Sequence, residues 1–189
     1  SVSLAVTSPP YWNAMEYSQF DSSDRSRHKA RTYARGFAGY DEYLSLMQRI
    51  GSELYRVTKP GGFCAVVVGS IQHERRCVPI PTELSDRFRQ LGWEIHHEIV
   101  WHKTRSVMDR AGSFVQRPYP GYFHPNVLTE SILVFRKPGP RIFEIKTSDQ
   151  KQDAALPVTS LMTRDVFNNV WAIPTVHPEL LDHPCPFPE

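Results

Sequence analysis

The sequence predicts an α/β fold, in which amphipathic helices alternate with the strands of one sheet. Apolar residues recur at helical spacing over 41–57, and the continuous apolar run Phe63 to Gly69 follows. The same order of helix and strand is repeated over 82–101. A continuous apolar run is typical of a strand covered on both faces, and this alternation favours parallel strands. We therefore expect an α/β sheet with helices on both faces.

The first expected strand ends at a double proline. The apolar run Leu4 to Val6 leads into Ser8-Pro9-Pro10-Tyr11. A residue before proline is pushed toward extended backbone and proline has no N–H for a sheet, so the strand must stop there. The strand end then presents a hydroxyl, the Pro9 carbonyl and an aromatic ring. Two acceptors beside a ring suit a planar ligand with an exocyclic NH2, although a plain strand end with Tyr11 in the core remains an alternative.

The remaining elements follow in order. Asp41 and Glu42 suit the start of the first helix, and the turn over 59–62 ends it. The second helix is expected over 82–91, with Thr82 as its cap and Gly92 as its stop. Strands are expected over 93–101 and 131–135, separated by a loop that contains proline and glycine. Beyond Phe135 the regular pattern weakens.

Composition excludes several classes of protein. The chain has 189 residues, of which 40% are hydrophobic, enough for one domain with a real core. Three cysteines, odd in number and widely spaced, indicate neither a disulfide framework nor a structural zinc site. His96 and His97 should point to opposite faces of a strand, so no metal site is expected. There is no run of about 18 apolar residues and no secretion leader, so we expect a cytoplasmic protein.

Positive charge is concentrated in three segments. Residues 22–36, 102–121 and 136–151 carry net charges of +4, +3 and +3, and the rest of the chain sums to −8. Basic loops attract a phosphate backbone, although solvated loops are also often basic without any partner. The candidate DNA-binding residues are Arg25, Arg27, Lys29, Arg31, Lys103, Arg105, Arg110 and Arg117.

The segment Thr7 to Asn13 resembles the catalytic tetrapeptide region of the DNA amino-methyltransferases, which methylate the exocyclic amine of cytosine or adenine. Further segments resemble the same family in the same order along nearly the whole chain: 56–62, Trp101-His102-Lys103, Glu130 to Lys137, Val170 to Pro174 and His183 to Glu189. That order matches the subgroup in which the catalytic half precedes the cofactor half. The resemblance implies the catalytic half of a Rossmann-like methyltransferase sheet.

The resemblance also implies a reaction on double-stranded DNA with S-adenosylmethionine as methyl donor. The target base would be flipped out of the duplex, because its amine is otherwise engaged in pairing. Ser8, Pro9, Pro10 and Tyr11 would be the catalytic residues, with Ser8 and Pro9 holding the amine and Tyr11 stacking on the base. Serine at the first position favours N4 of cytosine, and N6 of adenine is the alternative.

One expected motif of the family is missing. The sequence contains no Gly-x-Gly turn, which in the family approaches the cofactor. The candidate cofactor neighbours are His183, Pro184, Phe187 and Pro188. We interpret 1–137 as the catalytic half, 138–169 as a target-recognition segment and 170–189 as the lead-in to the cofactor half. A downstream segment or a second chain would supply the rest. A DNA-binding module without catalysis is the alternative of another class.

Overall fold

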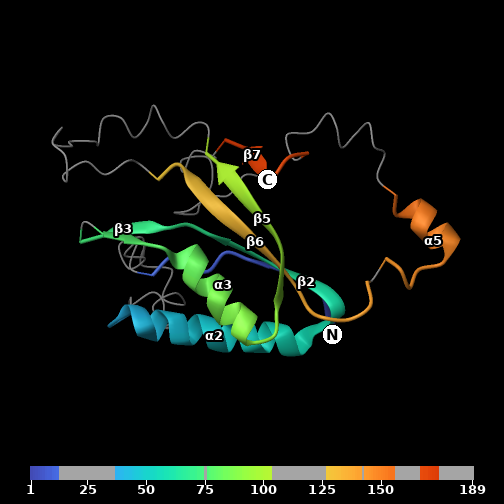
Figure 1. Ribbon diagram of the computed structural model, residues 1–189, viewed down its shortest axis with the longest axis horizontal. Coiled ribbons are helices and arrows are strands. Elements are labelled where there is room, and N and C mark those ends of the chain that lie inside the picture. Colours follow the sequence, from blue (N-terminus) through green and yellow to red (C-terminus); the bar gives the residue numbers. More distant parts are fainter. Residues whose placement is uncertain (13–36, 75, 104–126, 142, 156–166, 175–189) are drawn as a thin grey trace, which may run out of the picture.

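The computed structural model describes residues 1–12, 37–74, 76–103, 127–141, 143–155 and 167–174. Two sheets are present in these residues, one of five strands and one of two (Figure 1). The strands are β1 Val2–Thr7, β2 Thr58–Val68, β3 Ile71–His73, β4 Arg76–Val78, β5 Glu94–His102, β6 Thr129–Arg136 and β7 Val170–Ala172. The helices are α2 Tyr40–Val57, α3 Ile80–Gln90 and α5 Ser148–Asp153.

The five-stranded sheet has the order β1-β2-β6-β5-β7. Strands β1 and β2 are parallel and are joined through α2, and β5 and β7 are also parallel. Strand β6 runs antiparallel to both of its neighbours, β2 and β5. The predicted α/β sheet with parallel strands is therefore confirmed. The antiparallel strand at its centre was not predicted.

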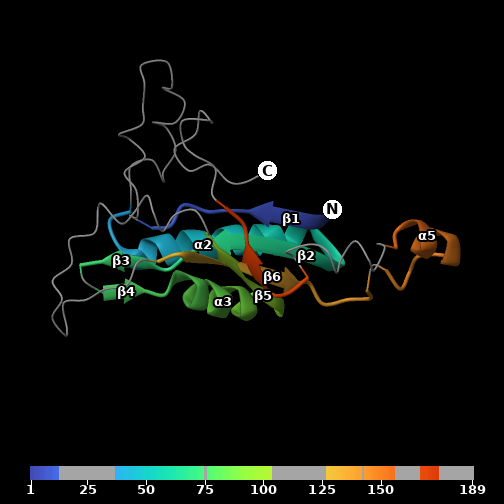
Figure 2. The ribbon, with the colours of Figure 1, turned by 90° about the horizontal axis from the view of Figure 1, so that it is seen from above.

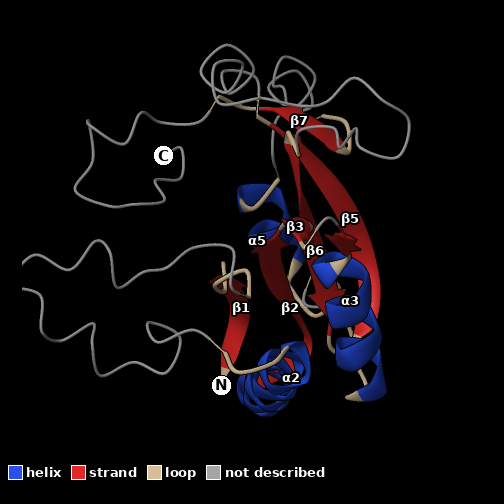
Figure 3. Cartoon of the chain, turned by 90° about the vertical axis from the view of Figure 1, so that its left-hand side faces the viewer, coloured by secondary structure: helices blue, strands red, loops and turns tan. Residues whose placement is uncertain are grey.

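Helices α2 and α3 pack against each other on the same side of the sheet (Figure 3). Their apolar residues, among them Tyr43, Leu84 and Phe88, meet alternate residues of the central strands in one core. Cys64 and Phe135, which are paired across β2 and β6, are completely buried there. Burial of this face is the main stabilising contribution, because hydrophobic stabilisation grows with the apolar area removed from water.

The opposite face of the sheet is apolar and partly exposed. Leu4 is 59% exposed and Val6 67% exposed, while Phe63, Ala65 and Val67 are half-buried. Helices were predicted on both faces of the sheet. Within the described residues, α2 and α3 cover one face. Helix α5 and the β3–β4 hairpin lie at opposite ends of the sheet (Figures 1 and 2).

Two element boundaries differ from the prediction. Strand β2 begins at Thr58, so Pro60, Gly61 and Gly62 form an irregularity inside the strand instead of a turn before it. Gly61 has a φ of 78°, which glycine adopts without steric cost. Helix α3 begins after Pro79, so the expected cap at Thr82 is wrong. Pro81 lies in the first turn of α3, which suits proline because the N–H that it lacks has no partner there.

The expectation for the two neighbouring histidines was also wrong. The pairing of β5 with β6 shifts between Ile95 and His97, which interrupts the regular alternation of side chains. The rings of His96 and His97 consequently lie 4.4 Å apart, measured between their centroids. A sequence pattern of alternating faces holds only where the strand is regular.

Candidate active site

The tetrapeptide Ser8-Pro9-Pro10-Tyr11 follows immediately on the end of β1, as the sequence predicts. The Ser8 residue is exposed, whereas Pro9, Pro10 and Tyr11 are half-buried. Because β1 and β2 are parallel, the tetrapeptide lies at their carboxyl edge, where α/β sheets bind ligands. The four residues predicted to be catalytic are consecutive, so they lie on one loop at this edge.

Tyr11 is held by a carboxylate from a distant strand. Its hydroxyl donates a hydrogen bond of 2.7 Å to Oε2 of Glu130, at the start of β6. The other oxygen of Glu130, Oε1, accepts from Nζ of Lys103. The side chains of Glu130 and Lys103 are 7% and 14% exposed. This is a partly buried chain of three polar groups behind the tetrapeptide.

Gly69 makes room for this chain of contacts at the end of β2. A Cβ atom at position 69 would lie 3.2 Å from Cγ of Glu130 and 3.5 Å from Cε2 of Tyr11. The first of these distances is tighter than ordinary van der Waals contact, so a larger residue here would press on the carboxylate. The carboxyl end of β2 is therefore shaped around Tyr11 and Glu130.

Aromatic contacts support the residue after the tetrapeptide. The ring of Trp12 lies 5.0 Å from that of Tyr40 and 4.6 Å from that of His73, between centroids. Tyr40 is the first residue of α2, and burial, followed by the charge of Glu83, raises its pKa to about 12. Tyr40 contacts the loop through the packing of its ring against Trp12.

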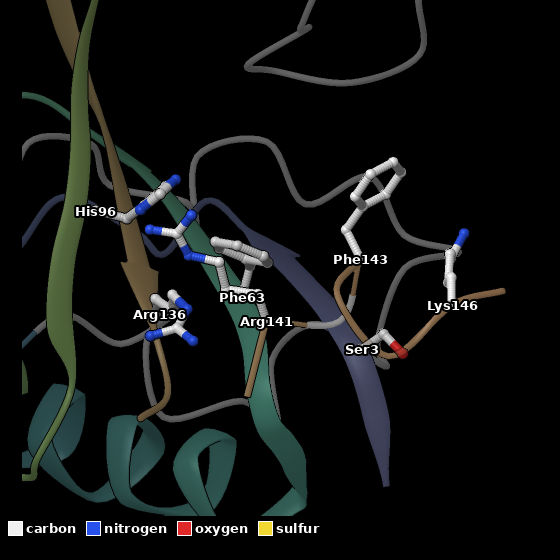
Figure 4. Close-up of a pocket in the computed structure, with 7 residues that line it drawn as sticks. All are labelled: Ser3, Phe63, His96, Arg136, Arg141, Phe143 and Lys146. Carbon is white, nitrogen blue, oxygen red and sulfur yellow. The ribbon is translucent and has the colours of Figure 1, made fainter. Parts of the chain in front are cut away.

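A separate cavity of about 480 Å³ lies at the other end of β2 and β6 (Figure 4). Phe63 and Arg136, which line it, are paired strand neighbours, whereas the Glu130 end of β6 lies beside Gly69. The Arg136 guanidinium is already paired with Glu94 at 3.0 Å. Burial and then the nearby charges of His97, Arg136 and Arg141 lower the pKa of His96. The cavity thus has no part in the tetrapeptide site.

The other predicted site residues are distributed as follows. Lys103 is described and is paired with Glu130, and its contact with DNA stays a prediction. Helix α5, within the candidate recognition segment 138–169, lies at the end of the sheet away from the tetrapeptide (Figure 1). Outside the described residues lie Arg25, Arg27, Lys29, Arg31, Arg105, Arg110, Arg117, His183, Pro184, Phe187 and Pro188.

Two absences hold for the described residues. They contain no group of three or more His, Cys, Asp and Glu side chains that would hold a metal ion. Within the same residues, no helix has both the length and the apolar character needed to cross a membrane.

Sequence reasoning missed Glu130 as a member of the site. In the sequence, Glu130 is the first residue of a segment that resembles the family, and no function was predicted for it. The available signal was an acidic residue directly before the expected strand 131–135, since a carboxylate that is buried requires a partner. Its two partners, Tyr11 and Lys103, lie 119 and 27 residues away, so the sequence pattern alone does not join them.

Fold and site together define an α/β protein whose ligand edge is formed by the carboxyl ends of β1 and β2. The chain belongs to the DNA methylase family N6_N4_Mtase, which matches residues 2–189. The suspected family is thereby confirmed.

Relatives of known name are similar over most of the chain. The type II beta methyltransferase M.BslI of Bacillus sp. (strain NEB-606) is 26% identical and covers 98% of this chain. The type II methyltransferase M.MthZI of Methanothermobacter thermautotrophicus is 27% identical and covers 80%. The chain spans only 19% and 43% of the lengths of these two relatives.

Solved structures share the fold. A Thermus thermophilus protein assigned as a DNA modification methylase, in complex with S-adenosyl-L-methionine, is 27% identical with a TM-score of 0.61. The match covers 91% of this chain and 61% of that one. PvuII DNA methyltransferase, which is cytosine-N4-specific, matches 100% of this chain and 60% of its own, with a TM-score of 0.56. Its identity is 15%, so this second likeness concerns the fold alone.

Proposed function

We propose that these residues form the catalytic, target-base-binding part of a DNA methyltransferase that uses S-adenosylmethionine and acts on N4 of cytosine. The observation that carries the proposal is the position of the tetrapeptide. Ser8 is exposed at the carboxyl edge of β1, and Tyr11 is fixed beside it by Glu130. Membership of the DNA methylase family supports DNA as the substrate.

The tetrapeptide suits a flipped base with an exocyclic amine. The Ser8 hydroxyl and the Pro9 carbonyl each accept one hydrogen of the amine, and this arrangement frees the nitrogen lone pair from the ring. Tyr11 stacks on the face of the base, a contact that is worth about 1–3 kcal/mol per base in single-strand binders. No covalent nucleophile is needed for this chemistry.

S-adenosylmethionine, when bound, supplies an electrophilic methyl group. The described residues do not form its cradle, since the sequence has no Gly-x-Gly turn and the candidate neighbours lie outside them. We propose that a further segment, downstream or on a second chain, provides most of that cradle. The exposed apolar side chains of Leu4 and Val6 on strand β1 support this, because contiguous apolar surface commonly marks an interface.

The basic segments are proposed to grip the phosphate backbone. Lys103 is already paired with Glu130, so the charges over 22–36 and 105–117 are the better candidates. If these residues contact phosphates, the logarithm of the affinity falls linearly with the logarithm of the salt concentration. A slope near zero in a titration with duplex DNA would remove this part of the proposal.

The choice of base can be tested directly. Ser8 favours cytosine, because the adenine enzymes of the family more often carry aspartate or asparagine at that position. Nucleosides released from methylated DNA should contain N4-methylcytosine. Recovery of N6-methyladenine would instead establish the alternative specificity without affecting the proposed class of reaction.

The Ser8→Ala variant tests the catalytic role. In the methylation-competent protein, the loss of one acceptor should lower methylation by about 100-fold, because a group left unpaired in a closed site costs about 1–3 kcal/mol. Duplex binding should change little. The matched control is Ser52→Ala, which removes an exposed hydroxyl on α2. A wild-type protein that binds duplex but never methylates it would favour the non-catalytic DNA-binding module.

A further inference from the structure

Glu130 and Lys103 have a property that the proposed function does not explain. Both side chains are largely buried, at 7% and 14% exposure, and they form an ion pair. Charged side chains are seldom buried, even when they are paired. Removing two charges from water is costly, and replacing such a pair with apolar residues is often neutral or stabilising. The burial of the pair is therefore weak evidence for a purely stabilising role.

The two oxygens of Glu130 have different partners. Oε1 accepts from Lys103, and Oε2 accepts from the hydroxyl of Tyr11 at 2.7 Å. With one oxygen held by a cation, the carboxylate has a fixed orientation when it meets Tyr11. A hydrogen bond to an ionised acceptor is about twice as strong as a neutral one, so Tyr11 is held firmly at the far end of its ring.

The location of the pair adds a second argument. Glu130 is paired with Trp101 across β6 and β5, and Lys103 follows the last residue of β5. Lys103 also lies 5.2 Å from the centroid of the Trp101 ring. All of these groups therefore belong to strand ends of the sheet, whereas Tyr11 belongs to a loop. The sheet holds Glu130 in place, and the hydrogen bond from Tyr11 to Glu130 ties the tetrapeptide to the sheet.

We propose that Glu130 is a positioning residue for the reaction, with Lys103 as its counterion: the carboxylate holds the hydroxyl end of Tyr11 and so fixes the position of the ring against which the target base stacks. The inference rests on the proposed function, since it assigns Tyr11 to the base. It adds that stacking alone is insufficient. The ring must also be tethered at its hydroxyl, and a phenylalanine would stack on the base but lack this tether.

The test compares variants of the methylation-competent protein. Tyr11→Phe keeps the stacking face and removes the tether, and Glu130→Ala removes the acceptor. Each should lower the single-turnover methylation rate by about tenfold or more, which is the size of effect expected from the loss of a hydrogen bond to a charged group. Duplex affinity should stay within about twofold. Both substitutions break the same hydrogen bond between Tyr11 and Glu130. The double variant should therefore methylate no more slowly than the slower of the two single variants.

A rescue variant separates positioning from folding. Glu130→Gln combined with Lys103→Met removes both charges but keeps an oxygen that accepts from Tyr11. This double variant should recover most of the rate that Glu130→Ala loses. The matched control is Glu53→Gln, which breaks an ion pair of 2.8 Å with Arg56 whose side chains are 67% and 69% exposed. It should leave the rate unchanged.

A fluorescent base analogue at the target position gives a readout that does not depend on methyl transfer. Tethering predicts a high emission anisotropy of the bound analogue, which falls in Tyr11→Phe and Glu130→Ala and returns in the rescue variant. Unchanged rate and anisotropy in a folded Glu130→Ala protein would overturn the inference alone. A wild-type protein that never methylates DNA would overturn the proposed function, and the inference with it.

Discussion

The indole of Trp93 donates a hydrogen bond of 3.2 Å to the backbone carbonyl of Gly51, 42 residues earlier. Gly51 lies in α2, and Trp93, which is 2% exposed, lies between α3 and β5. The contact therefore joins the first helix to the entrance of a strand. At the same position α2 approaches Phe88 and Leu91 closely, because Gly51 has no side chain.

Gly51→Ala should destabilise the protein. The new Cβ atom would lie 2.8 Å from Cε2 of Phe88, closer than real contacts allow, and 3.1 Å from Cδ1 of Leu91, which is a tight contact. The expected cost is about 1–3 kcal/mol, because overpacking displaces the two helices. Chemical denaturation measures it. Ser52→Ala, at the exposed neighbouring position, is the control and should be neutral or slightly stabilising.

Lys137→Met should also lower the free energy of unfolding. The ammonium group of Lys137 donates to the carbonyl oxygens of Tyr55 at 2.7 Å and Thr58 at 2.8 Å, at the end of α2. It also lies 4.5 Å from the centroid of the Tyr55 ring. Loss of these charge-assisted bonds should cost about 1.5–3 kcal/mol. Lys59→Met, at an exposed lysine nearby, should cost far less, and equal losses would contradict the assignment.

The described cysteines should differ in reactivity. Burial raises the pKa of the Cys64 thiol to about 11, whereas Cys77 is exposed. Because the thiolate is the reactive form, a thiol reagent at mildly alkaline pH should modify Cys77 quickly and Cys64 only on unfolding. A Cys185→Ser background removes the third thiol. Rapid modification of both remaining thiols in the native protein would contradict the buried position of Cys64.

The sequence was sufficient for the elements that local patterns determine. Apolar spacing predicted α2 within one residue at its start, and the double proline placed the end of β1 correctly. Gly92, with a φ of 96°, ends α3 as predicted. Helix α5 was missed because its six residues include no buried side chain and so leave no apolar pattern. The signal that could have found it is the capping box of Thr147 and Gln150 at its start.

What the sequence could not supply depends on distant pairing. The irregularity that places His96 beside His97 arises from the register between β5 and β6. The link from Tyr11 to Glu130 spans 119 residues and exists only once β6 lies beside β2. Local propensity carries no record of such contacts. The position of the tetrapeptide at the end of a strand could therefore be predicted, whereas the contact that holds Tyr11 could not.

The position of β6 has a consequence for the order of folding. It separates β2 from β5, so neither of these strands has its inner neighbour until the chain has been synthesised as far as Arg136. Contacts between residues so distant in sequence close large loops and form slowly. Until β6 emerges, the apolar strands on either side of it lack a partner, and the event that completes the sheet also brings Glu130 to Tyr11. We therefore expect completion of the core and assembly of the site to coincide during folding.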